Sequence, residues 1–494
     1  MKYLLTVLFL SFLSPLASAD TSARIEAIIP KLEKFISSGL DQSHVPGAAV
    51  AIVSEGKVVY MKGFGYRDLA NRLAVTPNTV FQLASVSKPL TTTVLAMLAA
   101  QDKLFWDAKI VDLTPSFALS DPWVTAHLTI LDLLSHRSGL PDHAGDLQED
   151  LGYLREEILH NLRYIRNLGD FRESYAYTNF GFSQAAYAAA PDWEMTAQKI
   201  LFKPLGMSRT SYSFLAYEKS PDRALTYKIK AGKALVVDPA RNPDAQAPAG
   251  GASSTVSDMA KWMLLQLDEG TDEALSKALA KTHVPVIVIG VDSETGRPNF
   301  YGLGWNVSFE EGKTFLKHSG AFALGVRSEV ALVPEERIGI VFLSNASPTA
   351  LPEAVTKAFF DLLYKGEVEE GLVKRYNEKW MKYEVEPEVF YQVKEALPSL
   401  PLAAYAGSYE NRYFGKIEVK EGEGKKQLAL VIVPSGKVFA MRHVTRDVFA
   451  IRTDGENSVG ETQVLFLLDV EGKVRSVTID YLNEFGEGTF FKNP

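Results

Sequence analysis

The sequence predicts a two-part protein, with an α/β domain followed by a small, separate all-β domain. Strand-like segments near residues 47–60 and 315–343 enclose a long helical region. After residue 400 the chain changes to short β-rich runs separated by glycines. The length of 494 residues suits two to three domains. With 46% hydrophobic and 23% charged residues, the composition is that of a globular protein and excludes a largely disordered chain.

The first nineteen residues have the pattern of a secretory signal peptide. Lys2 precedes an apolar run from Tyr3 to Leu13, Pro15 breaks the run, and Ala17-Ser18-Ala19 supplies small side chains. The alternative is an uncleaved anchor, but the run is short for a bilayer span, which needs about 20 residues. We expect cleavage after Ala19, no membrane span in the mature chain, and a secreted or periplasmic location.

Strands and helices of the first domain, residues 20–365, follow from periodicity and turn residues. Two strands flank the turn Ser54-Glu55-Gly56, a helix runs from Ser85 to Ala100, and residues 107–225 are mainly helical. Thr255 to Asp258 resembles a capping box before an apolar helix. The expected elements are strands Gly47–Val53 and Lys57–Tyr60, helix Met259–Leu267, a buried strand or core piece Val284–Val291, strands Phe315–His318, Ser328–Val333 and Ile338–Leu343, and helix Ala354–Tyr364.

The remaining chain divides into a linker and a β-rich tail. Residues 366–400 are charged and proline-containing, which indicates a linker with room for one helix. Residues 401–494 contain short strands with glycine turns between them, which indicates an antiparallel barrel or sandwich. Its clearest runs are Leu428–Val433, Val438–Met441, Val464–Leu468 and Ser476–Tyr481.

Charge and composition exclude several classes of function. The net charge is −8 and no basic block is present, which argues against nucleic acid or an anionic membrane as partner. The chain has no cysteine, so disulfides, thiolate nucleophiles and cysteine-ligated zinc are excluded. The eight histidines include no HExxH pair, and no cofactor motif is visible, so we expect neither a metal nor a cofactor. The expected partner is a small-molecule substrate, and the oligomeric state stays open.

Ser85-Val-Ser-Lys88 is the first candidate for chemistry. If Ser85 opens a helix, Lys88 lies on the same face and its amine can accept the hydroxyl proton, provided that its pKa is lowered. The motif alone is weak evidence, because Ser54-Glu-Gly-Lys57 matches it in a predicted hairpin turn. A solvated lysine near a serine is the ordinary interpretation of any single match.

Two further segments complete a constellation in chain order. Tyr177-Thr-Asn179 offers a phenol that can shuttle a proton and an amide that can bind a substrate amide. His318-Ser319-Gly320 ends a strand, where glycine would let a substrate lie along the strand edge. Each tripeptide pattern also matches elsewhere in the chain, and we call these further matches decoys. They are Tyr409-Glu-Asn411, Tyr481-Leu-Asn483 and His143-Ala-Gly145.

Together these segments resemble the serine β-lactamase and penicillin-binding superfamily, most closely its class C-like branch, which also includes D,D-peptidases, D-amino-acid peptidases and carboxylesterases. The tail resembles the lipocalin-like C-terminal domain of some members, opening at Tyr405 to Tyr409. The segments that carry the resemblance of residues 30–365 are Val45–Val50, Phe81–Pro89, Leu128–Pro141, Tyr175–Phe180, Pro248–Gly251 and Tyr301–Trp305.

The resemblance implies an antiparallel sheet flanked by helices, with a helical subdomain. It implies that Ser85 is the acylated nucleophile, Lys88 its proton acceptor and Tyr177 the relay to the leaving group. It further implies that Asn179, His318, Ser319 and Gly320 bind substrate, and that the backbone N–H groups of Ser85 and Ala321 form an oxyanion hole.

One position departs from the pattern of many β-lactamases, which carry Lys-Thr-Gly where this chain has His318-Ser319-Gly320. Histidine, with an ordinary pKa of about 6.5, is mostly neutral at pH 7 and is a poor anchor for a carboxylate. We therefore expect a secreted serine hydrolase acting on esters, or on amides and peptides. The alternatives are a D-amino-acid peptidase, a β-lactamase, or a penicillin-binding module that hardly turns over.

Several polar residues near these segments have structural interpretations. We expect His136 to be a buried packing residue and Arg327 a surface or structural residue. Asp132 and Asp258 are expected to be helix-end or hydrogen-bonding carboxylates.

Overall fold

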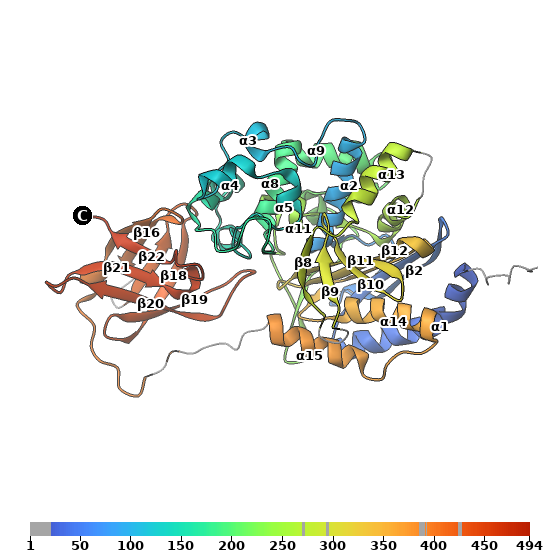
Figure 1. Cartoon of the computed structure of the whole chain (residues 1–494). Helices are drawn as coiled ribbons and strands as arrows, with labels where there is room; N and C mark the ends of the chain where they lie inside the picture. Colours follow the sequence, from blue (N-terminus) through green and yellow to red (C-terminus); the bar gives the residue numbers. More distant parts are fainter. Residues whose placement is uncertain (1–20, 269–271, 293–295, 385–390, 392, 423–426) are drawn as a thin grey trace, which may run out of the picture.

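The computed structural model describes residues 21–268, 272–292, 296–384, 391, 393–422 and 427–494. The predicted signal peptide, residues 1–19, lies outside the described residues. In the part of the chain that is described, no helix combines the length and apolar character that a membrane crossing requires. We call residues 21–384 the sheet domain and residues 402–494 the barrel (Figure 1).

A nine-stranded sheet with the order β3-β2-β1-β13-β12-β11-β10-β9-β8 forms the centre of the sheet domain. Its recorded strand pairs are antiparallel, and β1, from the N-terminal end, pairs with β13 from the far end of the domain. The strands are β1 Gly47–Ser54, β2 Lys57–Asp68, β3 Leu73–Ala74, β8 Ile287–Val291, β9 Pro298–Tyr301, β10 Asn306–Glu310, β11 Lys313–Phe322, β12 Val326–Val333 and β13 Ile338–Ser344.

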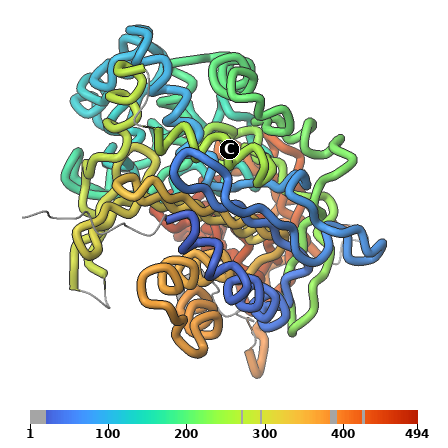
Figure 2. Tube along the Cα trace, turned by 90° about the vertical axis from the view of Figure 1, so that its right-hand side faces the viewer, coloured from blue at the N-terminus to red at the C-terminus, as the bar shows by residue number. Residues whose placement is uncertain are grey.

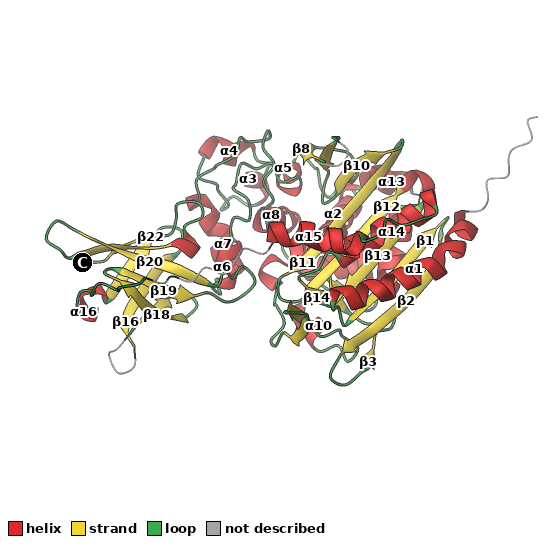
Figure 3. Ribbon diagram, turned by 90° about the horizontal axis from the view of Figure 1, so that it is seen from below, coloured by secondary structure: helices red, strands yellow, loops and turns green. Residues whose placement is uncertain are grey.

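Helices cover both faces of this sheet, which explains why β1, β12 and β13 are buried along their whole length, and why β1 and β13 consist mostly of apolar residues. One face carries α1 (Thr21–Ser43), α14 (Leu351–Lys365) and α15 (Leu372–Glu384). Figure 2 shows α1 and α14 side by side although they come from opposite ends of the domain, and Figure 3 shows the three helices over the strands. The other face carries α2 (Ser87–Ala99), α12 (Val256–Gln266) and α13 (Glu273–Thr282).

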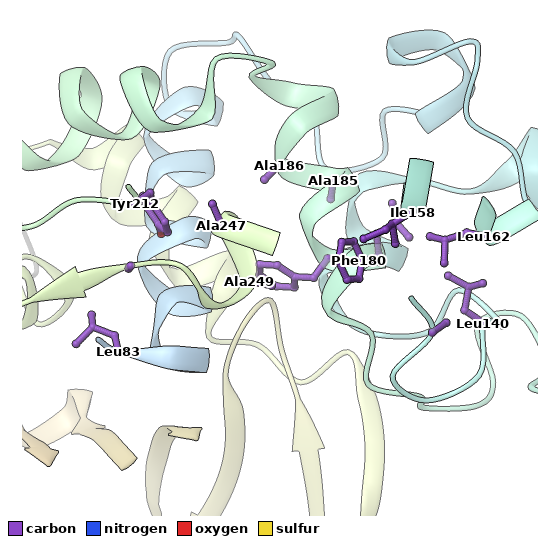
Figure 4. Packing of buried hydrophobic residues seen from close by; sticks show 14 of the residues in the cluster. Leu83, Leu140, Ile158, Leu162, Phe180, Ala185, Ala186, Tyr212, Ala247 and Ala249 are labelled. Carbon is purple, nitrogen blue, oxygen red and sulfur yellow. The ribbon is translucent and has the colours of Figure 1, made fainter. Parts of the chain in front are cut away.

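A helical region lies beyond α2. Its core is tightly packed: Figure 4 shows Phe180 between Ala249 on one side and Ile158 on the other. This packing places the start of α8 against the start of α2. The helices are α3 Ile110–Leu113, α4 Pro122–His127, α5 Ile130–Leu134, α6 Asp146–Asp150, α7 Arg155–Asn161, α8 Asn179–Ala189, α9 Trp193–Ala197, α10 Phe214–Glu218 and α11 Ala247–Gly250.

Two small sheets connect the helical region to the central sheet. One pairs β4 (Phe81–Gln82) with β7 (Ser253–Ser254), directly before the 3₁₀ turn η1 (Ala84–Val86). The other contains β14 (Ala346–Ser347), β5 (Tyr227–Lys230) and β6 (Lys233–Val236).

The tail folds as a closed antiparallel barrel in which each strand pairs with its neighbours in sequence. Buried residues alternate along the strands, and the interior is filled by aromatic rings such as Tyr405, Phe449 and Phe466, which contact one another. The elements are α16 Leu402–Tyr405, β15 Gly407–Asn411, β16 Gly415–Glu421, β17 Leu428–Ile432, β18 Lys437–Thr445, β19 Val448–Arg452, β20 Glu461–Leu468, β21 Val474–Ile479 and β22 Thr489–Lys492.

The predicted fold class is confirmed, with a barrel as the form of the second domain, and the differences lie in particular elements. The prediction of a buried segment at Val284–Val291 is wrong in its burial: β8 is the edge strand of the sheet, and Val288 and Val291 are 52% and 67% exposed. The helix predicted from Ser85 begins as the η1 turn and becomes α-helical only at Ser87. The predicted linker contains α15, which packs on α1 and α14.

Candidate active site

Ser85 lies in the η1 turn that leads into α2, next to strands β11 and β12 of the central sheet. Leu83 N donates to the Ala252 carbonyl (2.8 Å), and Ser328 Oγ donates to the Leu83 carbonyl (2.7 Å), so the backbone before Ser85 is fixed from two sides. Ala84 has a φ of 46°, a left-handed conformation that costs about 1–3 kcal/mol for a residue with a side chain. The fold thus holds a strained residue next to this hydroxyl, as functional sites often do.

Lys88 is fully buried one turn further along α2. Its Nζ lies 3.2 Å from Ser85 Oγ, 2.7 Å from Asn179 Oδ1 and 3.0 Å from the Ala249 carbonyl oxygen. Burial holds the pKa of Lys88 well below its ordinary value; the Asp146 carboxylate acts in the opposite direction and the charge of Arg241 in the same direction, and burial outweighs both. A neutral amine donates to Asn179 and Ala249 and keeps its lone pair for the Ser85 hydroxyl proton.

Tyr177 places a phenol on the same serine. Its hydroxyl donates to Ser85 Oγ (2.8 Å), and Lys88 Nζ lies 4.4 Å from the centre of its ring. Burial raises the pKa of Tyr177, so the phenol keeps its proton and serves as a donor.

His136 holds the segment that carries Tyr177. Its carbonyl accepts from Ala176 N (2.9 Å), and its Nδ1 accepts from Thr178 N (3.1 Å). Burial lowers the pKa of His136 well below its ordinary value, which keeps the ring neutral and able to accept. His136 is buried, as the sequence indicated, and its contacts position Tyr177.

Asn179, at the start of α8, links Lys88 to a carboxylate that the sequence analysis missed. Its Nδ2 donates to Asp146 Oδ2 (2.8 Å), and the same oxygen lies 2.8 Å from His143 Nδ1. Both ends of the Asn179 amide are therefore engaged within the protein, and its predicted contact with a substrate amide stays a prediction. Within the described residues, Asp146 Oδ1 is buried without a partner.

His143, which belongs to the segment His143-Ala-Gly145, lies beside this site. The backbone N–H of His143 donates to the Tyr177 carbonyl oxygen (2.7 Å), and the centres of the two rings lie 5.6 Å apart. Burial opposes the charged form, yet the Asp146 carboxylate raises the pKa of His143 to about 9. The signal for both residues was their position directly after the segment Leu128–Pro141.

The open edge of β11 forms the other side of the site. The two-residue turn at Glu311-Gly312 makes Glu310 and Lys313 a hydrogen-bonded pair, so residues 313, 315 and 317 of β11 direct their N–H groups toward β10. The recorded pairing ends at Lys317. By the same alternation, the N–H of Ala321 also points to the β10 side of β11, in the part of the strand where β10 no longer pairs with it.

Gly320 brings this edge against Ser85. A side chain there would collide with the Leu83 carbonyl and the Ser328 hydroxyl, and its Cβ would lie 3.0 Å from Ser85 N. The position therefore requires glycine. The Ala321 N–H and the backbone of Ser85 consequently lie close together, which suits a site for a developing negative charge on a carbonyl oxygen.

His318 is buried and locked between two partners. Nδ1 lies 2.7 Å from the Ser319 carbonyl oxygen, which only accepts, so Nδ1 carries the proton. Nε2 then accepts from the Tyr301 hydroxyl at 3.0 Å. Burial and the nearby Lys88 lower the pKa of His318 to about 3, so the ring is neutral at physiological pH. The predicted contacts of His318 and Ser319 with substrate stay predictions.

The other polar residues considered in the sequence lie away from Ser85. Arg327 is buried, pairs with Glu353 on α14 (2.5 Å) and stacks on Trp380, which makes it structural. Asp132 forms a capping box with Thr129, and Asp258 accepts from Arg209 N (2.8 Å). The Tyr-x-Asn decoys lie in the barrel, and within the described residues no three His, Asp or Glu side chains gather as a metal site.

The geometry therefore brings a serine hydroxyl, a buried amine and a phenol within hydrogen-bonding reach of one another, beside an open strand edge. Such an arrangement can remove a proton from an alcohol, stabilise an oxyanion and return the proton to a leaving group.

Two known family models match this chain. The family model described as Beta-lactamase matches residues 32–362. A second model, described as a domain of unknown function (DUF3471), matches residues 391–492 and so covers the barrel. Two thirds of the chain thus correspond to one known family.

Among curated proteins, the Unguisins hydrolase ungD' of Aspergillus campestris is 28% identical over 436 residues, which are 80% of this chain and 78% of that protein. Protein flp of Staphylococcus aureus is 25% identical over 336 residues, 66% of this chain and 64% of that protein.

Two solved structures share the fold. The octameric penicillin-binding protein homologue from Pyrococcus abyssi matches with a TM-score of 0.61 at 22% identity, covering 94% of this chain and all of that one. The beta-lactamase from Sulfitobacter sp. EE-36 matches with a TM-score of 0.56 at 20% identity, covering 69% of this chain and 99% of that one.

Proposed function

The chain belongs to the beta-lactamase family of serine hydrolases, and from this premise we propose that it hydrolyses esters, and more slowly amides, through an acyl-enzyme on Ser85. The observation that carries the proposal is the position of Ser85 Oγ, 3.2 Å from the buried Lys88 amine and 2.8 Å from the Tyr177 hydroxyl. A relative that is 28% identical is also named a hydrolase, which agrees with this class.

In the proposed acylation step, Lys88 Nζ takes the hydroxyl proton while Ser85 Oγ bonds to the substrate carbonyl carbon. The carbonyl oxygen becomes an oxyanion and accepts from the N–H groups of Ser85 and Ala321; one such donor contributes roughly 3 kcal/mol to transition-state stabilisation. Collapse expels the leaving group, which receives its proton through the Tyr177 hydroxyl, next to Lys88. Water then attacks the acyl carbon, which releases the acid and restores the Ser85 hydroxyl.

Charge around the site favours substrates without a carboxylate. His318, where many relatives carry a lysine, has the pKa of its ring lowered to about 3 and uses both ring nitrogens within the protein. His143 is flanked by Asp142 and Asp146, at 3.9 and 2.8 Å, so its charge is already balanced. A carboxylate on the substrate therefore meets no free cation among these residues, and we place neutral esters before β-lactams and C-terminal carboxylates.

The decisive experiment combines labelling with a matched pair of substrates. Intact-mass spectrometry after treatment with a fluorophosphonate probe is expected to show one adduct on the wild type and none on Ser85→Ala. p-Nitrophenyl acetate and the p-nitrophenyl monoester of succinate share a leaving group and differ in one carboxylate. We expect kcat/KM to be about 10-fold or more higher for the acetate, because the anion has no partner.

Other outcomes separate the alternatives. An unlabelled wild type would exclude the serine mechanism. Faster turnover of nitrocefin than of either ester would indicate a β-lactamase, and faster turnover of D-amino-acid peptide amides would indicate a peptidase. Rapid acylation by benzylpenicillin without turnover of any substrate would indicate a penicillin-binding module.

We also propose that the protein works outside the cytoplasm, on the pattern of residues 1–19. N-terminal sequencing of the protein from an expressing bacterial host is expected to begin at Asp20. A chain that retains Met1 in the cytoplasm would contradict this.

A further inference from the structure

The barrel loop of residues 453–460, between β19 and β20, contacts the sheet domain close to the site around Ser85. The loop contacts two elements of that domain: the turn between β11 and β12, and helix α6. The turn directly follows the β11 strand that contains Ala321, and α6 begins with Asp146. A single loop of the second domain therefore reaches both walls of the site.

Glu456 makes the contact with the β11–β12 turn. Its carboxylate accepts from the backbone N–H of Ala323 (2.7 Å) and of Leu324 (3.1 Å). Ala323 is two residues after Ala321, and Phe322 is the last residue of β11. The N–H groups of a strand-connecting turn otherwise bond to water or within the turn, so a carboxylate from another domain fixes this turn in one position.

Arg241 joins this contact to the rest of the site. Its guanidinium lies 3.0 Å from Glu456 Oε1 and 2.5 Å from Glu149 Oε2 on α6, and it stacks on the ring of Phe322 at 4.3 Å. The Arg241 carbonyl accepts from Gln82 Nε2 (2.8 Å), three residues before Ser85. The buried arginine thus contacts the segment before the serine, the end of β11, α6 and the barrel.

The neighbouring residue of the loop engages α6. Asn457 N donates to Asp150 Oδ2 (2.6 Å), and Asn457 Nδ2 lies 3.4 Å from the Asp146 carbonyl oxygen. Asp146 in turn accepts from Asn179, which contacts Lys88.

The Glu456 side chain is only 9% exposed. A buried carboxylate is costly unless it is paired and hydrogen-bonded, and Glu456 has one cation and two N–H donors. Removing it would leave Arg241 and two backbone N–H groups short of a partner, and the turn would lose its fixed position.

We propose that Glu456 is a positioning residue of the active site, supplied by the barrel, which holds the β11 edge so that the Ala321 N–H meets the developing oxyanion. The proposal rests on the function proposed above. It assigns to the barrel a direct effect on the rate of acylation.

The test compares Glu456→Ala and Glu456→Gln with Glu461→Gln in the full chain. Glu461 is the matched control, because it pairs with Arg442 and Tyr391 within the second part of the chain. For p-nitrophenyl acetate, Glu456→Ala is expected to lower kcat by about 10- to 100-fold while KM changes by less than about threefold, since a small displacement of an oxyanion donor acts on the transition state. Glu456→Gln keeps one acceptor oxygen and is expected to recover part of kcat, and Glu461→Gln to stay within about twofold.

Phenylboronic acid forms a tetrahedral adduct on serine, and its inhibition constant would not change through a general loss of stability. Its inhibition constant is expected to rise in parallel with the fall in kcat in the Glu456 variants. Hydrogen exchange of the unliganded protein is expected to be faster at residues 321–325 in Glu456→Ala and unchanged in Glu461→Gln.

The outcomes distinguish this inference from the proposed function. Wild type that is not labelled at Ser85 overturns the proposed function, whereas the exchange measurement still tests the positioning contact. If the wild type is labelled at Ser85 but Glu456→Ala shows the same kcat, boronate inhibition constant and hydrogen exchange as the wild type, the inference is overturned and the proposed function is not. A rise in KM without a fall in kcat also overturns it, because it would assign Glu456 to substrate binding.

Discussion

The chain contains two Ser-x-x-Lys segments, Ser54–Lys57 and Ser85–Lys88, which the structure places in opposite environments. At Ser54 the motif spans a hairpin: Ser54 ends β1, Lys57 begins β2, and Glu55 and Gly56 turn between them with φ values of 50° and 79°. Lys57 is exposed, and within the described residues the buried Ser54 Oγ has no partner. At Ser85 the same spacing lies on a turn and helix, and the lysine is enclosed.

The difference shows that the spacing does not create the chemistry. A turn and helix bring residues three apart onto one face, and the packing of α8 and α11 against α2 then closes water away from Lys88. Burial lowers the pKa of that amine and makes it a proton acceptor. Both conditions are absent at the hairpin.

Replacing the two serines gives the largest expected contrast. Ser85→Ala is expected to lower kcat/KM for p-nitrophenyl acetate by about 10⁴-fold or more, because no other nucleophile replaces the hydroxyl. Ser54→Ala is the matched control and is expected to leave kcat/KM unchanged. Steady-state kinetics of both purified variants measure these values. A similar loss of kcat/KM in both variants would contradict the assignment of the nucleophile to Ser85.

Replacing the two lysines tests the enclosed amine. Lys88→Met keeps most of the side-chain volume and removes the base, so kcat is expected to fall by about 10³-fold, within the usual range for general-base catalysis. Lys57→Met places the same change in water and is expected to have no effect. Burst-phase acylation rates measure the step directly; an unchanged burst in Lys88→Met would show that another group accepts the proton.

A third contrast concerns the phenol that Ser85 has and Ser54 lacks. Tyr177→Phe removes the donor to Ser85 Oγ and is expected to lower kcat by about 10²-fold. Tyr175→Phe, two residues away in the same aromatic cluster, is the control and is expected to change kcat by less than about fivefold. Equal losses would assign the effect to packing.

The smallest expected effect is a change of stability with pH. Lys88 has a folded-state pKa far below 10.5, so between those two pKa values the unfolded chain binds more protons than the folded one, and wild-type stability rises with pH. Lys88→Met removes this dependence. The difference in unfolding free energy, variant minus wild type, should therefore decrease as the pH rises toward 10.5.

Urea unfolding at several pH values measures this difference, and Lys57→Met serves as the exposed control. A difference for Lys88→Met that is constant with pH would contradict the lowered pKa.

The sequence by itself determined the elements whose pattern is locally complete. The apolar runs of β1 and β13 and the apolar end of β12 predict strands, and the glycine-separated runs after residue 400 predict the barrel's strands. The resemblance of the segments around Ser85, Tyr177 and His318 indicated which residues to bring together. A short-range pattern suffices there because hydrogen bonding and burial along one element depend mainly on its own residues.

Tertiary structure alone decided which polar residues surround those segments. Asp146, Arg241 and Glu456 come from α6, a loop and the barrel, far apart in the chain, and no local pattern marks them. The same holds for β8, whose valines suggest a buried strand and whose place at the sheet edge leaves them exposed. Burial and charge pairing depend on which distant segments meet, and that choice is made by packing of the whole chain.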